Sequence, residues 1–280
     1  FYFCTWMGTG LCCDYLKKAA AFLQRAQIGH LFDIIDPGDD QMDYGLKEQQ
    51  KKTIKQYITC SGLENYVNLC LYLVHEFTGK AVAYKLPSAK PWCGIYVPHS
   101  NKVYTDLNNY LNGEKIDFNQ PTVGFIFSRE DWLWQKLTYQ NEIINALISK
   151  GCNVIAVFST TMPDEQTGAV SLSTALKKFF YQGNTAIIDA LINPFVFSLT
   201  VTGFLKLEDL QELGVPILQV VNTYMSQQWW EKSMVGLTPN EVSYAVCMPE
   251  FDGALHSVPV STNEKRDDGT HYRKALSERI

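Results

Sequence analysis

The sequence lacks the short motifs that mark the commonest nucleotide, zinc and hydrolase sites. It has no Gly-x-x-x-x-Gly-Lys-Ser/Thr loop for nucleotide phosphates, no Gly-x-Gly-x-x-Gly turn for a dinucleotide and no Gly-x-Ser-x-Gly elbow for a nucleophilic serine. His75-Glu76 lacks the second histidine of a His-Glu-x-x-His zinc helix. These absences argue against a P-loop ATPase, a dinucleotide-dependent enzyme and the usual hydrolases.

Other absences concern partners and compartment. The chain has no stripe of Lys and Arg and carries a net charge of −5, so a nucleic-acid partner is not expected. No apolar run reaches the roughly 18 residues of a membrane span, and the given sequence shows no basic-then-apolar pattern of the kind that marks a signal peptide. Its 8 cysteines form no Cys-x-x-Cys pair and sit mostly in apolar runs, which predicts free thiols in a reducing, cytoplasmic setting.

The pattern of apolar and polar residues changes near residue 120. From there, short apolar runs alternate with helix-like segments, which predicts an α/β fold with a doubly wound, mostly parallel sheet over about 120–260. We predict a mainly helical segment at 1–118, a Rossmann-like α/β domain at 119–262, and a linker with the start of a further helix at 263–280. Both ends of the sequence resemble points inside a longer chain, so we expect a fragment of a larger multidomain protein. The sequence does not decide whether that larger protein associates with a membrane.

The predicted sheet also says where a ligand should bind. The expected strands are 122–127, 153–158, 186–191, 195–201 and 216–221, and the expected helices are 139–150, 172–181 and 207–213. Ligands of such sheets bind at the carboxyl ends of the strands. Before the sheet, helices are expected within 1–35 and at 45–59, 62–73 and 104–111.

One stretch near the end of the chain concentrates candidate chemistry. An aromatic pair, Trp229 and Trp230, is followed by a helix start at 236–239. An apolar run then leads into a Pro- and Gly-bounded turn that holds Glu250 and Asp252. The pattern indicates a site that contains acids, without naming the reaction.

Several separated blocks, in this order, resemble the large subunit of the tetrapyrrole chelatases, the family of the cobaltochelatase large subunit and the magnesium chelatase porphyrin-binding subunit. The blocks are Gly62-Leu63-Glu64-Asn65 with Asn68-Leu69 and Tyr72-Leu73, Trp92-Cys93-Gly94-Ile95-Tyr96-Val97-Pro98, Pro121-Thr122-Val123-Gly124 with Arg129, Val215-Pro216-Ile217-Leu218-Gln219, Trp230 with Gly236-Leu237-Thr238-Pro239, Pro249-Glu250-Phe251-Asp252-Gly253, and the closing Ser277-Glu278-Arg279-Ile280. The last two blocks before the closing one are the most specific. The chain departs from the family at His99, which follows the Pro of the second block where a His before it is expected, and at Ala254 and His256.

The resemblance implies a function. It implies a segment of a catalytic subunit that binds haem, a porphyrin or a corrinoid and inserts or removes a divalent Co, Mg or Fe ion. Insertion would use ATP only through partner subunits, an AAA+ ATPase and an adaptor. A haem-dechelating branch that is similar to this family removes iron instead, so the metal, the macrocycle and the direction stay open.

Moving a metal into a tetrapyrrole requires a proton acceptor, transient metal ligands and a shaped pocket. Glu250 is the first candidate for proton transfer or metal ligation, because an apolar run and a glycine turn would desolvate its carboxylate. Its alternative role is that of a turn carboxylate that accepts backbone N–H bonds. Asp252 is the second catalytic candidate, and its alternative role is to form the turn. His256 is the third, as a neutral imidazole that ligates the metal, against a structural or exposed histidine.

Four further residues are candidates for tetrapyrrole binding. Arg129 could pair with a ring carboxylate, or simply form a surface ion pair. Trp229 and Trp230 could stack on the macrocycle, or one of them could anchor a helix in the core. His99 completes the set.

Two other functions stay open. A non-catalytic tetrapyrrole carrier or sensor would keep the pocket without the chemistry. A solute-binding scaffold with a similar sheet would have no affinity for tetrapyrroles.

Overall fold

The computed structural model describes residues 2–4, 25, 31–33, 45–98, 100, 102–165 and 168–280. It divides the chain into two compact units, Phe1–Lys90 and Pro91–Ile280. The sequence pattern placed this boundary after residue 118. The difference arises because two short strands, β3 (Gly94–Val97) and β4 (Lys102–Tyr104), pair into the main sheet although their Pro- and Gly-rich surroundings resemble a loop.

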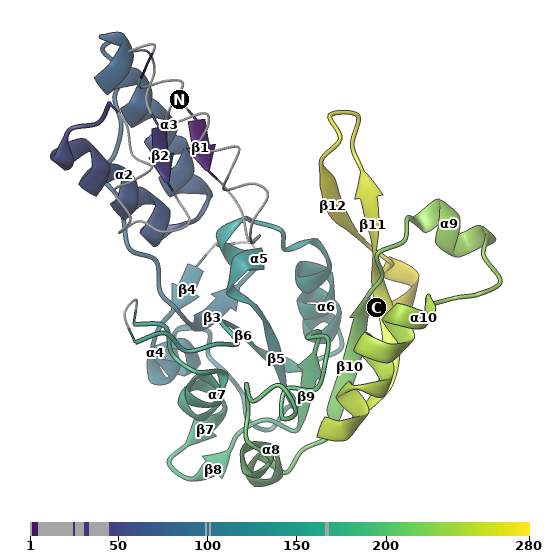
Figure 1. The fold of residues 1–280 in the computed structure, drawn as a ribbon. Helices are drawn as coiled ribbons and strands as arrows, with labels where there is room; N and C mark the ends of the chain where they lie inside the picture. The colour runs from purple at the N-terminus through teal and green to yellow at the C-terminus, as the bar shows by residue number, and fades with distance from the viewer. Residues whose placement is uncertain are drawn as a thin grey trace. The chain divides into compact units, whose positions relative to one another are not determined.

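The first unit contains a helical hairpin formed by α2 (Glu48–Cys60) and α3 (Leu63–Thr78) (Figure 1). Its buried core is Ile54, Tyr57, Leu69 and Tyr72. Both helices agree with the sequence prediction. The helix-like pattern within 1–35 is only partly described: residue 25 is helical, whereas β1 (Tyr2–Cys4) and β2 (Leu31–Asp33) are strands that pair in parallel, and the rest of the range lies outside the described residues. Short apolar runs do not separate a strand from a buried helix.

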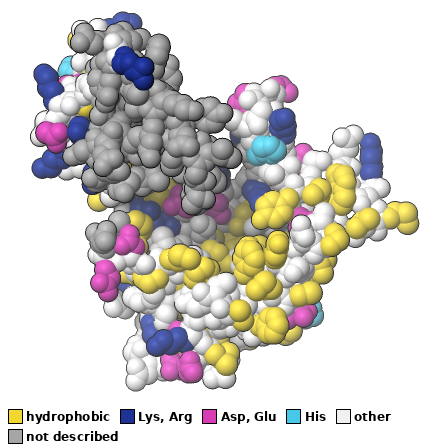
Figure 2. Space-filling view, in the orientation of Figure 1, with side chains coloured by type: hydrophobic (Ala, Val, Ile, Leu, Met, Phe, Trp, Pro, Cys, Tyr) yellow, Lys and Arg dark blue, Asp and Glu magenta, His cyan; other side chains and the backbone are white. Residues whose placement is uncertain are grey.

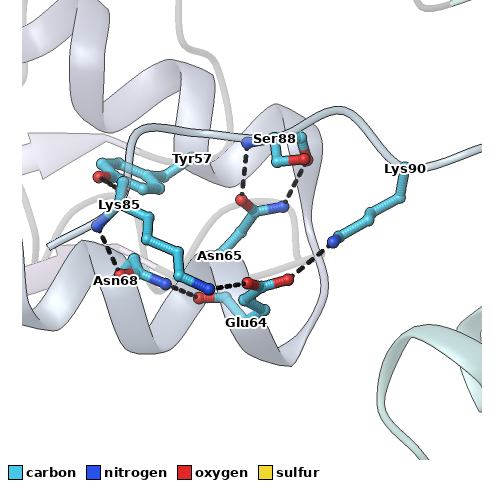
Figure 3. Close-up of polar contacts among 7 residues, drawn as sticks. All are labelled: Tyr57, Glu64, Asn65, Asn68, Lys85, Ser88 and Lys90. Atoms are coloured by element: carbon cyan, nitrogen blue, oxygen red, sulfur yellow. Dashed lines mark hydrogen bonds and ion pairs between the residues drawn. The ribbon is translucent and has the colours of Figure 1, made fainter.

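Two asparagines of α3 fasten the extended segment that follows the helix (Figure 3). Asn65 Nδ2 donates to Ser88 O at 2.9 Å, and Asn65 Oδ1 accepts from Ser88 N at 3.0 Å. Asn68 Oδ1 accepts from Lys85 N at 2.8 Å. Both side chains are buried. The Gly-Leu-Glu-Asn block therefore has a structural role, because it supplies backbone partners to a segment that has no strand of its own.

Glu64 adds two exposed ion pairs to this arrangement. Its carboxylate lies 2.8 Å from Lys90 Nζ and 3.0 Å from Lys85 Nζ. Hydrogen bonds from Lys90 and Lys85 lower the pKa of Glu64 to about 2. Since exposed ion pairs contribute little to stability, the buried asparagines should matter more.

Replacing Asn65 by Ala should release the segment around Ser88. The variant removes both bonds to Ser88 and leaves its backbone groups to water, at a cost of about 1–3 kcal/mol to local stability. Hydrogen exchange at the Ser88 amide should accelerate accordingly. The matched control is Gln56→Ala, an exposed amide on α2. Equal exchange at Ser88 in both variants would contradict the assigned role.

The second unit is an eight-stranded sheet with the order β12-β11-β10-β9-β5-β6-β3-β4. Its strands are β3, β4, β5 (Thr122–Ser128), β6 (Asn153–Ser159), β9 (Ala190–Asn193), β10 (Ile217–Asn222), β11 (Ala254–Lys265) and β12 (His271–Ala275). The five strands from β11 to β6 are parallel, β12 and β3 run antiparallel to them at either side, and β4 pairs antiparallel with β3. The predicted doubly wound, mostly parallel sheet is confirmed. After β5 and β6 the chain returns to the other side of β5, where it adds β9, β10 and β11 in turn.

Helices cover both faces of this sheet, as buried parallel strands require. One core includes residues of α4 (Leu107–Gly113), α7 (Leu172–Phe180) and α8 (Leu207–Leu213). The other includes residues of α6 (Thr138–Ser149), with α5 (Arg129–Leu133) preceding it. Gly124 of β5 lies so close to its neighbours that an added Cβ would meet Ile188 Cδ1 at 2.7 Å. None of the helices in the described part of the chain is both long and apolar enough to cross a membrane.

Two predicted segments differ in the structure. Residues 195–201 form an irregular loop rather than a strand, because polar contacts described below organise their backbone. The region 263–280 is not a linker: β11 continues to Lys265, β12 pairs back onto it, and Figure 1 shows the two as a hairpin that extends from the sheet. A short 3-10 helix, η3 (Ser277–Arg279), follows. A small β7–β8 hairpin (Tyr181–Gln182 and Thr185–Ala186) follows α7.

Candidate functional site

The Pro249–Gly253 block lies directly before β11. Since β11 pairs in parallel with β10 and matches Ala254 with Ile217 at the start of that strand, the block lies at the amino-terminal edge of the sheet. Ligands of doubly wound sheets usually bind at the opposite edge. The candidate carboxylates are therefore separated from Arg129, which follows the carboxyl end of β5.

A continuous helical segment leads into the block. It comprises α10 (Pro239–Val242), a π-helix η1 (Ser243–Cys247) and a 3-10 helix η2 (Pro249–Asp252). Gly253 ends it with a φ of +75°, a conformation that glycine adopts without strain. π-helical turns occur frequently at functional sites. The change of helix type redirects the chain immediately before the candidate carboxylates.

Glu241 fixes the start of this segment and was not singled out from the sequence. It is 2% exposed and accepts hydrogen bonds from Thr223 Oγ1 at 2.5 Å, Tyr224 N at 2.6 Å and Thr238 Oγ1 at 2.7 Å. Burial alone would raise the pKa of Glu241, but the hydrogen bonds from Thr223, Thr238 and Tyr224 outweigh it, so the pKa is lowered. The Thr-Pro-x-Glu capping pattern was a signal for this residue.

The lowered pKa predicts an acid-sensitive contribution to folding. A carboxylate whose pKa is lower in the folded state stabilises the fold above its ordinary value of 4.5, and this stabilisation is lost as pH falls below that value through the folded pKa. The free energy of unfolding of Glu241→Gln should therefore depend less steeply on pH in this acid range than that of the wild type. Urea unfolding at a series of pH values measures this, with the exposed Glu208→Gln as control. Parallel curves for wild type and Glu241→Gln would contradict it.

Asp252 points inward and organises the loop after β9. It is 7% exposed, and its carboxylate accepts from Ser198 Oγ at 2.7 Å, Leu199 N at 2.6 Å and Thr200 Oγ1 at 2.6 Å, with Thr200 N at 3.1 Å. These bonds use the acceptor capacity of a carboxylate. The structure thus places Asp252 as a positioning residue.

Glu250 points the other way. Its side chain is exposed, as are those of Cys247 and Phe251 in the same stretch of chain, with Phe251 71% exposed. The desolvation expected from the apolar run is not provided by the described residues, because Pro249 and Asp252 take the inward positions of η2. Glu250 is accessible to a ligand that approaches this edge.

His256 lies in a β-bulge of β11. The register with β10 shifts between Leu218 and Val220, and His256 has a φ of +54°. It lines an apolar pocket of about 240 Å³ between the strands and α6, together with Leu147 and Val258. Asp252 instead accepts hydrogen bonds from the loop on the α7 side of the sheet. The side chains of His256 and Asp252 therefore lie on opposite faces of the sheet.

Arg129 is enclosed rather than exposed. It is 3% exposed, its Nε donates to Pro91 O at 2.9 Å, and its guanidinium lies 4.0 Å from the centroid of the Trp92 ring. The sequence analysis considered an ion pair at the surface, whereas the structure buries the Arg129 side chain. In this arrangement Arg129 fixes the start of the second unit, and a ring carboxylate would have to compete with Trp92 for it.

The two tryptophans lie on α9 (Gln227–Lys232), which buries none of its residues. Trp229 is 36% exposed, and the Arg279 guanidinium lies 5.4 Å from the Trp230 ring centroid. A core anchor is therefore not their role in this structure, whereas Trp229 is open to a stacking partner. His99 lies outside the described residues.

The carboxyl edge contains one further titratable group that the sequence did not highlight. Burial raises the pKa of Asp131 to about 6, against the opposing effect of Arg273. Gln140 Nε2 donates to Asp131 Oδ2 at 2.9 Å. Within the described residues, no three His, Cys, Asp or Glu side chains gather into a group that could hold a metal ion.

Comparisons with known proteins place these features in a family. The model for CobN/magnesium chelatase matches residues 55–280. An uncharacterised protein of Methanocaldococcus jannaschii is 35% identical over 239 residues, which cover 82% of this chain and 19% of the relative. The aerobic cobaltochelatase subunit CobN of a Sinorhizobium species is 28% identical over 262 residues, 89% of this chain and 20% of the relative.

A solved structure has the same fold. The catalytic subunit of cobaltochelatase from Mycobacterium tuberculosis aligns with a TM-score of 0.65 and 20% identity, over 89% of this chain and 20% of that chain. The chain thus spans about a fifth of the length of the relatives it matches.

Proposed function

The chain belongs to the CobN/magnesium chelatase family, and from that premise we propose that it is a segment of a chelatase large subunit that binds a tetrapyrrole and helps to move its central metal ion. The observation that carries the proposal is the family match over 55–280, which includes the whole sheet and the Pro249–Gly253 block. Because the relatives are about five times longer, the proposal concerns the role of this segment within a whole protein.

The chemistry assigns different tasks to the candidate residues. Insertion of a divalent ion releases two N–H protons from the ring, and removal returns two protons. We assign proton transfer to Glu250, whose carboxylate is exposed at the edge of the sheet. Asp252 is the residue that holds the turn. His256 is a proposed transient ligand of the substrate metal and Trp229 a proposed stacking residue, but His256 lies on the opposite face of the sheet from the Asp252 loop and Trp229 follows the carboxyl end of β10, so both belong to a different placement of the ring.

The substrates and partners follow from the same proposal. The ring is haem, a porphyrin or a corrinoid, and the ion is Co, Mg or Fe. Where insertion consumes ATP, an AAA+ partner with an adaptor would hydrolyse it, because this chain has no phosphate-binding loop. The thiol-rich composition supports a reducing, cytoplasmic setting.

The test uses the full-length protein under anaerobic conditions. One sample receives haem, and others receive a metal-free porphyrin or corrinoid with Co²⁺ or Mg²⁺, each with and without ATP and candidate ATPase partners. Absorbance spectra should show metal entering or leaving the ring in one of these samples. Conversion of haem to free porphyrin identifies a dechelatase, and ATP-dependent insertion identifies a biosynthetic chelatase. A spectral shift without turnover would favour the carrier, and no shift at all would overturn the proposal.

A further inference from the structure

Two aromatic side chains form an exposed pair beside the Pro249–Gly253 block. Phe197, in the loop after β9, and Tyr244, on the π-helix η1, have ring centroids 4.8 Å apart at an interplanar angle of 44°. Phe197 is 37% exposed and Tyr244 is 39% exposed. Figure 2 shows hydrophobic side chains gathered over the face of the second unit that carries α9 and α10. We call the Phe197–Tyr244 pair the aromatic shelf.

The backbone at Phe197 is held in an unfavourable conformation. Its φ is +65°, in the left-handed region that a bulky side chain rarely occupies. Such strain costs about 1–3 kcal/mol and persists only where surrounding contacts enforce it. Because 37% of Phe197 stays exposed, burial of the ring offsets only part of this cost, and the exposed part of the ring calls for a reason other than core packing.

The enforcing contacts come from the candidate block and from η1. Phe197 N donates to Tyr244 O at 2.7 Å. The next three residues of the loop, 198–200, are all bonded to the buried carboxylate of Asp252. The loop and the helical segment are therefore locked together, and the two rings keep a fixed mutual geometry.

We infer that the aromatic shelf is a stacking surface for the flat conjugated ring of the substrate, held in position by Asp252. The inference rests on the proposed function and deepens it, because it names the residues that would contact the macrocycle. Preformed, exposed aromatic rings favour flat π-systems through stacking and burial of apolar area. Glu250 and the exposed Phe251 belong to the same helical segment, so a ring on the shelf lies on the element that carries the proposed proton acceptor.

The decisive variant is Phe197→Gly in the full-length protein. Glycine adopts a φ of +65° without strain, so the thermal midpoint should stay equal or rise while the ring is lost. Affinity for haem, from the absorbance change on titration, and for a metal-free porphyrin, from fluorescence, should weaken about 10-fold. Tyr244→Ala should weaken both by a similar factor. Phe118→Ala, which removes a phenylalanine that is 51% exposed in a different loop, should leave both affinities within roughly two-fold of wild type.

The outcomes separate this inference from the proposed function. If the wild type binds a tetrapyrrole and the shelf variants bind it equally well, the shelf is overturned and the proposed function stands. If the shelf variants lose thermal stability without losing affinity, the rings pack against another part of the protein, which also overturns the shelf alone. If the wild type binds neither probe and also fails to bind a metal-free corrinoid, the proposed function fails and the shelf fails with it.

Discussion

Metal transfer by the full-length protein should slow about 10²–10⁴-fold when Glu250 is replaced by Gln, which is the usual contribution of a general acid or base. Glutamine keeps the shape of the side chain but cannot accept or return a ring proton. Tetrapyrrole affinity should stay within roughly two-fold of wild type, because the aromatic contacts are unchanged. The measurement is a single-turnover absorbance trace with the ring and ion identified by the wild-type assay.

The matched control is Glu208→Gln, which removes an exposed carboxylate from the first turn of α8. It should retain the wild-type rate. Full activity of Glu250→Gln would exclude Glu250 from proton transfer. A loss of affinity equal to the loss of rate would instead assign Glu250 to ring binding, since a residue that acts only in the transition state lowers the rate and leaves binding intact.

The alternating part of the fold could be predicted because its signals are local. The run Val123–Phe127 is apolar on both faces, as a central parallel strand requires, and the structure gives β5 as Thr122–Ser128. The helix predicted to stop at Gly151 ends at Ser149, and the one predicted at 207–213 has those bounds. Apolar periodicity and terminal glycines fix such elements without information from distant residues.

Elements that depend on distant partners could not be predicted in this way. Residues 195–201 are apolar enough for a strand, but the backbone N–H groups of Leu199 and Thr200 donate to Asp252, more than 50 positions away in sequence. β3 is a four-residue strand whose place in the sheet comes from pairing with β4 and β6. A pattern within one segment carries no information about such partners.

The sequence identified the candidate residues of the site but not the directions in which their side chains point. Composition and turn residues identified Glu250 and Asp252 as neighbours in a Gly-bounded turn. In the structure these residues lie on a 3-10 helix, on which the Asp252 side chain is buried and the Glu250 side chain is exposed. Neither the bulge at His256 nor the left-handed backbone at Phe197 has a local signature, because both residues are tolerated there only through their surroundings.

The largest expected effect on stability is that of Asp252→Ala. The change leaves Ser198 Oγ and the backbone N–H groups of Leu199 and Thr200 without their acceptor in a buried position. Bonds to a charged acceptor are worth more than neutral ones, so we expect a loss of about 3 kcal/mol. Hydrogen exchange in the full-length protein should report this loss at the Leu199 and Thr200 amides first, because they bond directly to the missing group.

Asp267→Ala, an exposed carboxylate at the tip of the β11–β12 hairpin, is the control and should leave exchange in the loop unchanged. If Asp252 acted on the ring itself, Asp252→Asn would abolish metal transfer without loosening the loop. If it acts by holding Phe197, the loop amides and tetrapyrrole affinity should change together, and Phe197→Gly should lower affinity further by less in the Asp252→Ala background than in wild type. Independent effects of the two substitutions on affinity would mean that Asp252 does not position the aromatic shelf.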